Sequence, residues 1–220
     1  MSYFIGVDVQ TTRGCPFAIL EENGNVIDDG WVKQGAPDDV VAALREIARR
    51  YKFGENVIAF AVDAPRTPLP APREWYWQSN RWRQCQPKDQ GAGRHCEIVV
   101  AAHSLANPQW TPSRPPFPQW MELGFAIFKG LDSEFEIYEV FPSASYRMLK
   151  GDGLTTITVR VGNFAQGPKD MLDAYVAAAT LREFVQGRGC EVGGGDNLGS
   201  IILPRPIEAP IDGVLKWPGT

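Results

Sequence analysis

The order of apolar segments in this 220-residue chain predicts an α/β fold with a mixed central sheet flanked by helices. Three strand-like segments come first, at 2–9, 15–20 and 26–32, and the pair Asn23-Gly24 marks a tight turn before the third. Later strand-like segments alternate with helical ones, and helical crossovers are what join parallel strands. We therefore expect an antiparallel meander that continues into parallel strands of the same sheet.

The remaining elements follow from the spacing of hydrophobic residues. Segment 36–53 repeats apolar side chains every three or four positions, which predicts an amphipathic helix with acids in its first turn. Segment 56–65 is a continuous apolar run, typical of a central strand covered on both faces. The β-branched residues of 155–164 favour a strand. We also expect helices at 95–106, 119–131 and 168–185, a strand at 135–143, and glycine-rich loops with a short strand at the end.

One region departs from this regular alternation. Between about 65 and 118 the chain is rich in proline, tryptophan and arginine, and outside the helix expected at 95–106 it shows no periodicity. Long irregular segments inside compact domains are often functional. The sequence shows no internal repeat and no domain-scale linker, so we expect a single domain over 1–220 that carries an irregular insertion at about 65–118.

Bulk composition narrows the function classes. The formal net charge is −4, so a nucleic-acid partner would need a local basic patch. The four cysteines form no Cys-x-x-Cys pair, and the spacing His95-Cys96…His103 does not match a zinc site. With no apolar run near about 18 residues and no signal peptide, we expect a cytoplasmic protein with reduced thiols and no membrane partner.

Asp173 is the least expected charge in the chain. It is the only charged residue between Met171 and Leu181, in a helix that is apolar nearly all round and is therefore expected to be buried. A buried carboxylate needs a partner or a metal ion. Asp170 lies three residues earlier, on the same side of the helix, although its place in the first turn also suits the helix dipole.

Two other acids sit at the ends of apolar strands. Asp8 interrupts the first strand and Asp63 ends the fourth; capping or turn formation is the simpler explanation of each one alone. If these two strands are neighbours, however, both acids emerge side by side, and helix 168–185 can lay Asp170 and Asp173 across them. Clustered carboxylates repel one another unless cations bind between them, and an all-oxygen ligand set selects Mg²⁺ or Mn²⁺.

Five short motifs occur in order between positions 6 and 174: Gly6-x-Asp8, Asp63-x-Pro65, Arg94-x-Cys96-Glu97, Glu139-x-x-Pro142 and Asp170-x-x-Asp173-Ala174. With the element order, they resemble the ribonuclease H-like fold, and the last motif is similar to that of its Holliday-junction resolvases. More closely, the chain resembles a family of predicted ribonuclease H-like nucleases catalogued as domain of unknown function 429 (DUF429). It departs from that family at Lys169, where another acid is frequent, in a longer segment after Asp8, and in the residues that follow Ala64.

The resemblance implies a nuclease that hydrolyses phosphodiesters with two Mg²⁺ or Mn²⁺ ions, about 3.5–4 Å apart. In such sites one ion activates water and the other stabilises the leaving oxygen, so no side-chain nucleophile is required. The implied catalytic and metal-binding residues are Asp8, Asp63, Asp170 and Asp173.

The resemblance also implies roles in substrate binding for three residues outside the acid cluster. Arg94 and Glu97 would face the acids, with Arg94 contacting a phosphate, although Glu97 near a helix start also suits the helix dipole. Glu139 is either an exposed strand acid or a residue of the active edge, because Pro142 fixes the exit of its strand.

The segment 73–94 is the candidate nucleic-acid contact. It carries five basic residues against two acids, with Trp and Tyr between them, and single strands are bound by cations that contact phosphates and rings that stack on bases. The candidate substrate-binding residues here are Arg81, Arg83 and Trp82. Two alternatives stay open: the rings anchor the loop to the domain, or they form a protein interface.

Two other function classes remain. The chain could be a non-catalytic member of the fold that binds nucleic acid or protein, or an actin-like phosphotransferase related to sugar kinases, for which "DVQTTRG" would be the phosphate-binding turn. The second class duplicates its domain, and this chain shows no repeat. Both DNA and RNA stay open as the substrate. The oligomeric state stays open too, although resolvase-like members form homodimers.

Overall fold

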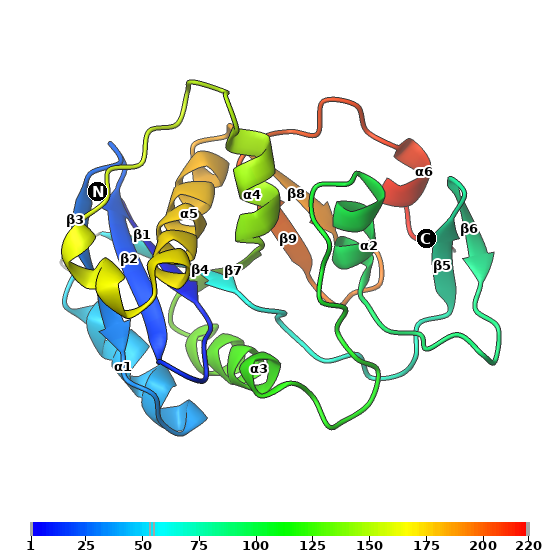
Figure 1. Cartoon of the computed structure of the whole chain (residues 1–220), viewed down its shortest axis with the longest axis horizontal. Coiled ribbons are helices and arrows are strands. Elements are labelled where there is room, and N and C mark those ends of the chain that lie inside the picture. The colour runs from blue at the N-terminus through cyan, green and yellow to red at the C-terminus, as the bar shows by residue number, and fades with distance from the viewer. Residues whose placement is uncertain (1, 53, 55, 219–220) are drawn as a thin grey trace.

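The computed structural model describes residues 2–52, 54 and 56–218, and it confirms an α/β architecture with a seven-stranded mixed sheet flanked by helices (Figure 1). The strand order is β3-β2-β1-β4-β7-β9-β8. The first three strands form an antiparallel meander, β1, β4, β7 and β9 are parallel, and β8 is antiparallel to β9. The strands are β1 Ser2–Asp8, β2 Cys15–Glu21, β3 Val26–Val32, β4 Val57–Asp63, β7 Glu136–Val140, β8 Cys190–Gly193 and β9 Ser200–Leu203.

Helices cover both faces of the sheet. α1 (Pro37–Arg49) and α3 (Gln119–Leu131) pack on one face, over inward side chains such as Ile5 and Phe60. α5 (Pro168–Val185) covers the other face, and α4 (Pro142–Leu149) packs against it. α2 (His95–Ala102) and α6 (Asp212–Leu215) form a smaller core with β8 and β9.

α5 lies unusually close to β1, and Gly6 makes this possible. A Cβ atom at Gly6 would lie 2.0 Å from the carbonyl oxygen of Ala174 and 2.4 Å from the backbone nitrogen of Ala178. The neighbouring contacts between α5 and β4 are also small, since Ala59, Ala61 and Ala177 share one buried cluster. The alanine-rich sequence of α5 therefore serves a close helix-to-sheet contact, which places the first turns of α5 at the ends of β1 and β4.

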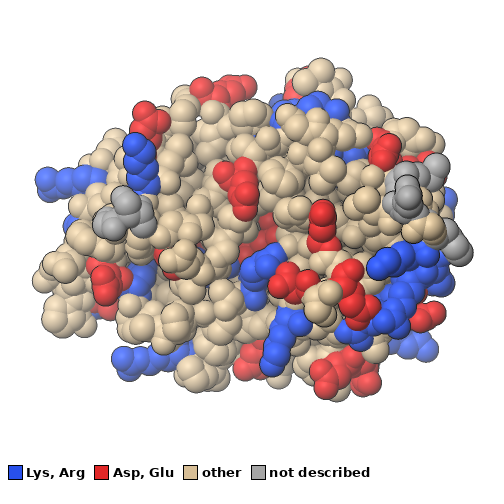
Figure 2. All heavy atoms as spheres, turned by 180° about the vertical axis from the view of Figure 1, so that it is seen from behind, with Lys and Arg blue, Asp and Glu red and all other residues tan. Residues whose placement is uncertain are grey.

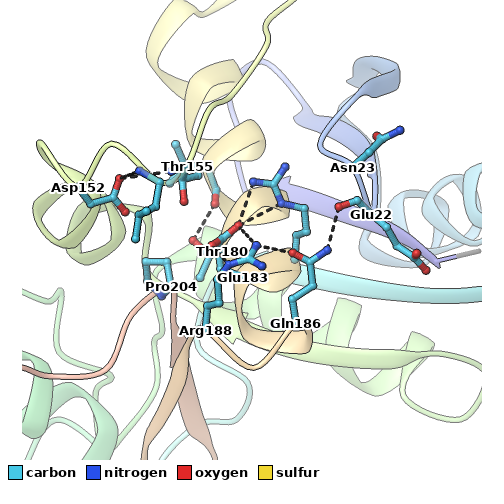
Figure 3. A network of polar contacts seen from close by, with 12 residues as sticks. Glu22, Asn23, Asp152, Thr155, Thr180, Glu183, Gln186, Arg188 and Pro204 are labelled. Atoms are coloured by element: carbon cyan, nitrogen blue, oxygen red, sulfur yellow. Dashed lines mark hydrogen bonds and ion pairs between the residues drawn. The ribbon is translucent and has the colours of Figure 1, made fainter.

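The opposite end of α5 is fixed by the buried carboxylate of Glu183 (Figure 3). Arg182, Arg188 and Arg205 donate to it over 2.9, 2.7 and 2.6 Å. Arg205 also pairs with Asp152 at 2.7 Å, so one cluster joins α5, the exit of β9 and the loop after α4.

The expected helices at 119–131 and 168–185 are confirmed with the same bounds, and helix 36–53 is confirmed over 37–49, its expected last residue, 53, lying outside the described residues. The strand expected at 155–164 is wrong. This segment is irregular and ends in the 3₁₀ helix η1 (Val161–Gln166). It lies beside β3 through side-chain contacts instead: Arg160 donates to the Val26 carbonyl, and Trp31 to that of Asn163. The β-branched residues favour a strand only where a neighbouring strand pairs with the backbone, and this segment contacts β3 through side chains instead.

The insertion at about 65–118 is more regular than expected. It contains a hairpin of β5 (Trp75–Gln78) and β6 (Arg81–Gln84), closed by Ser79 and Asn80 with φ of 52° and 57°. Two residues with positive φ are what a tight type I′ hairpin turn requires. α4 and α6 are short helices that hydrophobic spacing did not indicate, and β8 adds a second strand to the glycine-rich end.

Gly6→Ala is expected to destabilise the fold by about 3 kcal/mol, because the new methyl group meets helix backbone that cannot rotate away. Urea unfolding measures the change. Gly162→Ala is the matched control, because a Cβ there enters open space and a small effect is expected. Equal stabilities of the two variants would contradict the close contact.

Glu183 is expected to make stability fall in acid. Although burial raises the pKa of Glu183, hydrogen bonds from Arg188, Arg205 and Arg182 lower it from 4.5 to about 2. Its contribution, about 3 kcal/mol, is therefore complete above pH 4.5 and is lost as the pH falls toward 2. Glu183→Gln should remove this pH dependence and destabilise the protein at pH 7, whereas exposed Glu208→Gln should change neither; unfolding curves from pH 2 to 7 decide.

Candidate metal centre

Asp8 and Asp63 are paired residues at the ends of neighbouring parallel strands. In the register of β1 with β4, Asp8 lies directly opposite Asp63. Successive residues of β1 point to opposite faces of the sheet. Ile5 and Val7 therefore face α1 and α3, whereas Gly6 and Asp8 lie on the face that α5 covers. The fold thus brings two carboxylates together from positions 55 residues apart in the sequence.

α5 adds the third carboxylate. One carboxylate oxygen from each of Asp8, Asp63 and Asp173 can be chosen so that all three lie within 4.8 Å of one another. Asp8 and Asp173 are 4% and 5% exposed, and Asp63 is partly buried. We call these three residues the acidic triad.

The surroundings of the acidic triad make its negative charge unfavourable. Burial, together with the charges of Asp173 and Asp170, raises the pKa of Asp8 from 3.8 to about 7, although a hydrogen bond from Gln10 lowers it. Burial and the charges of Asp8 and Asp173 hold the pKa of Asp63 well above its ordinary value. Such a cluster favours either protons or a bound cation.

Three side chains orient and partly neutralise the triad. Gln10 Nε2 donates to Asp8 over 2.9 Å, and the Tyr146 hydroxyl donates to Asp173 over 2.8 Å. The Lys169 ammonium pairs with the other oxygen of Asp173. The sequence could have indicated Lys169 from its spacing of four on one helix. Tyr146 lies 27 residues from Asp173 and gave no local signal.

Asp170, the fourth predicted ligand, is placed beside the triad rather than in it. Its carboxylate lines one pocket together with the triad, but it pairs with Arg13, whose Nη2 lies 2.6 Å from Oδ2. Arg13 is 157 residues away in the sequence and comes from the segment after β1. The first-turn position of Asp170 therefore combines a favourable helix dipole with an ion pair.

Arg94, Glu97 and Glu139 form a buried ion cluster that borders this pocket. Arg94 is 1% exposed and pairs with Glu97 at 2.8 Å and with both oxygens of Glu139. Glu97 also accepts from the backbone of Thr111, and Glu139 from that of Arg66. The resemblance placed these three residues near the acids, and the structure does so, but the guanidinium of Arg94 is already bound by two carboxylates. Glu139 is buried, not an exposed strand acid.

The acids and the ion cluster line one pocket of about 320 Å³. Its walls come from the ends of β1, β4 and β7, the first turns of α2 and α5, and the segment before Trp110. Pockets of about 300–1,000 Å³ hold small ligands or one unit of a polymer.

The residues predicted in the hairpin lie elsewhere. Figure 1 shows β5 and β6 at the end of the molecule opposite β1 to β3. Trp82 donates to the carbonyls of Gly213 and Lys216 and packs edge-on against Trp217, so it anchors the hairpin rather than presenting a free ring. Arg83 is paired with Asp89 at 2.8 Å. Arg81 is exposed.

The side of the molecule seen in Figure 2 is not a single basic face. On the side turned away in Figure 1, lysine and arginine side chains are interspersed with aspartate and glutamate. Contacts to a polyanion would therefore be local, as the net charge of −4 indicates.

Comparisons with known proteins give no relative: no family model, no curated protein and no solved structure matches the chain. Among the described residues, no helix combines the length and apolar character that crossing a bilayer requires. Function has to be argued from the site itself.

The ligand atoms of the acidic triad suit a hard divalent cation. All three are carboxylate oxygens, held by a strand pair and a helix, and no cysteine or histidine joins the described cluster. Mg²⁺ and Mn²⁺ prefer such ligands, whereas zinc prefers nitrogen and sulfur. A cation would also offset the burial and the repulsion that raise the pKa values of Asp8 and Asp63.

Asp8→Asn is expected to stabilise the protein at pH 8 in EDTA, by up to about 4 kcal/mol, because the pKa of Asp8 rises from 3.8 to about 7 on folding. The stability that the protonated carboxyl provides is complete below pH 4 and is lost as the pH rises through 7, so the variant should gain nothing at pH 4. Thermal unfolding at both values measures this.

Manganese provides the complementary test. Mn²⁺ should raise the melting temperature of the wild type, because a ligand that binds only the folded state stabilises that state. It should not raise that of Asp8→Asn, which lacks one of the ligands. Asp38→Asn, at an exposed acid of α1, is the control and should behave as the wild type. If Mn²⁺ leaves the melting temperature of the wild type unchanged, the assignment of a metal centre is contradicted.

Proposed function

We propose that this chain is a metal-dependent nuclease with a ribonuclease H-like fold, related to the DUF429 family. The observation that carries the proposal is the acidic triad: carboxylates from the first strand, the fourth strand and the last long helix converge within 4.8 Å in a pocket. This is the placement on which the sequence resemblance depends.

The sheet supports the same proposal. Its β3-β2-β1-β4-β7 portion begins as an antiparallel meander and continues with parallel strands on the other side of β1, with α5 packed over β1 and β4. β8 and β9 extend it beyond β7. One fold serves many functions, so the chemistry has to be argued from the residues of the site.

Asp8, Asp63 and Asp173 would hold Mg²⁺ or Mn²⁺, and such ions activate water and stabilise the leaving oxygen of a phosphodiester. Gln10 and Tyr146 fix the carboxylates of Asp8 and Asp173 by hydrogen bonds, which keeps a ligand set in one geometry. Three carboxylates suffice for one ion. A second ion would need Asp170, whose carboxylate is paired with Arg13.

The buried ion cluster of Arg94, Glu97 and Glu139 stabilises the wall of the pocket. Arg94 holds the β7 residue Glu139 and the α2 residue Glu97 together, so it fixes the distance between the strand ends and the pocket wall. Its charge also offsets that of Glu139, a carboxylate whose negative charge helps to raise the pKa of Asp63. We propose that Arg94 acts on the substrate through this positioning, not through direct contact with a phosphate.

One observation favours a second candidate, the non-catalytic member of the fold that binds nucleic acid. The Lys169 ammonium already pairs with Asp173, at a position where the resembled family often has an acid. Although burial lowers the pKa of Lys169, its hydrogen bond to Asp173 and the charges of Asp173, Asp8 and Asp63 raise it, so the lysine is held in its charged form. A positive charge in the triad reduces the need for a divalent ion.

Nuclease assays separate the two candidates. With Mn²⁺, the wild type should cleave single-stranded or branched DNA or RNA, and Asp173→Asn should reduce the rate at least about 100-fold, because it removes a ligand that stabilises transition-state charge. Asp170→Asn should have a smaller effect, since Asp170 lies outside the triad. Gel-resolved cleavage of labelled oligonucleotides measures both.

Two controls make the assay decisive. Asp38→Asn should cleave as the wild type does, and melting curves should show that Asp173→Asn is folded. If a folded, Mn²⁺-binding wild type cleaves none of these substrates, the non-catalytic candidate replaces the nuclease.

A further inference from the structure

A second pocket contains an arginine with an unusual environment. The Nε and Nη1 atoms of Arg73 are buried and have no hydrogen-bond partner, and Arg73 makes no ion pair with the part of the chain that the structure describes. Its guanidinium carbon lies 4.1 Å from the ring centroid of Tyr76 and 5.4 Å from that of Trp110. Two aromatic rings therefore lie against a cation whose Nε and Nη1 donors have no hydrogen-bond partner.

The neighbouring Arg83 shows what this environment lacks. Arg83 lies 4.7 Å from the same ring of Tyr76, but its guanidinium also pairs with Asp89. Arg73 has the ring without the anion. Removing a cation from water without an anionic partner is unfavourable, and contacts with rings compensate only in part.

The pocket beside Arg73 has a volume of about 410 Å³, and no acid lines it. Its walls are three rings, one amide and four aliphatic side chains, and Arg73 is its one charge: Arg73, Tyr76, Trp77, Gln90, Ala92, Ile98, Ala101, Ala102 and Trp110. The rings come from the hairpin and from the segment after α2, and α2 itself closes the remaining side with Ile98, Ala101 and Ala102.

A glycine makes the arrangement of Arg73 and Trp110 possible. Gly93 has φ of +96°, and a Cβ there would lie 2.4 Å from Trp110 and 3.0 Å from Arg73 Nη1. Its backbone nitrogen donates to the Thr111 carbonyl over 2.7 Å, which fixes the segment that carries Trp110. The guanidinium and the ring therefore have defined positions.

From this geometry we infer that the Arg73 pocket binds a nucleotide, with a phosphate on the guanidinium and the base against the rings. A guanidinium matches the shape and charge of a phosphate, and aromatic side chains stack on any base. The inference deepens the proposed nuclease function and rests on it in one respect: the nucleotide would be a unit of the substrate strand.

The position of the pocket agrees with such a strand. Pro108 and Gln109 line the pocket of the acidic triad, and the next residue, Trp110, lines the Arg73 pocket. α2 likewise contributes Glu97 to the first pocket and Ile98 to the second. The two pockets share no lining residue, so a ligand in one does not fill the other.

Binding in EDTA tests the inference without hydrolysis. The probes are a fluorescently labelled single-stranded oligothymidylate, followed by anisotropy, and a free mononucleotide, followed by calorimetry. Arg73→Met should weaken binding about tenfold or more, because it removes the phosphate partner and keeps the length of the side chain. Lys88→Met, which removes an exposed charge from the same insertion, should change affinity less than about twofold.

Ala101→Phe provides a second variant that keeps every charge. Its ring would fill the pocket from α2 and should weaken binding as Arg73→Met does, while melting curves show that both variants fold. Because the guanidinium of Arg73 has buried donors without partners, Arg73→Met is not expected to lower the melting temperature.

The outcomes separate the sources of the nucleotide. Arg73-dependent binding of the strand supports the pocket as a substrate site, and Arg73-dependent binding of the mononucleotide alone supports a pocket for a free nucleotide. Wild-type affinity in Arg73→Met, an equal loss in Lys88→Met, or no binding of either probe would overturn the inference. A wild type that binds the strand through Arg73 but never cleaves it would remove the nuclease proposal and leave the pocket.

Discussion

The contact of α5 with β1 at Gly6 is the constraint on which the rest of this structure depends. With no side chain at Gly6, the backbone of Ala174 lies directly on the strand, and the adjacent Asp173 reaches the end of β1. A larger residue at Gly6 would lift the helix and separate Asp173 from Asp8. The Glu183 cluster fixes the other end of α5, so the helix is held along its length while its first turns carry the acids.

This contact brings together groups that destabilise one another. Asp8 and Asp63 are adjacent in register and lose hydration, which is why their pKa values rise. The core around them compensates, because apolar clusters fill both faces of the sheet. Clustered carboxylates reduce stability, and they are typical of sites that bind ions or catalyse reactions, because perturbed pKa values concentrate at functional sites.

Sequence reasoning predicted the features that depend on local periodicity. Apolar runs placed the main strands and helices, and an isolated acid in an apolar helix indicated Asp173 as a buried partner of Asp8 and Asp63. It could not predict pairings set only by the folded chain. Arg13 holds Asp170 from 157 residues away, and two carboxylates hold Arg94, so neither group is as free as its sequence position indicated. Segment 155–164 had strand composition but lies beyond β3 without a ladder, and the 75–84 hairpin was concealed by its proline-rich flanks.

Lys169 gives the acidic triad a further property. Because its ammonium already pairs with Asp173, a divalent ion that bound there as proposed would compete with an internal cation, and its uptake would exchange one positive charge for two. The lysine is largely exposed and sits on a flexible stem, so the displaced ammonium can move without disturbing α5. It would then stand at the mouth of the pocket, free to meet the negative charge of whatever ligand follows the ion. Occupancy of the site and attraction of an anionic ligand would thus be linked through one side chain.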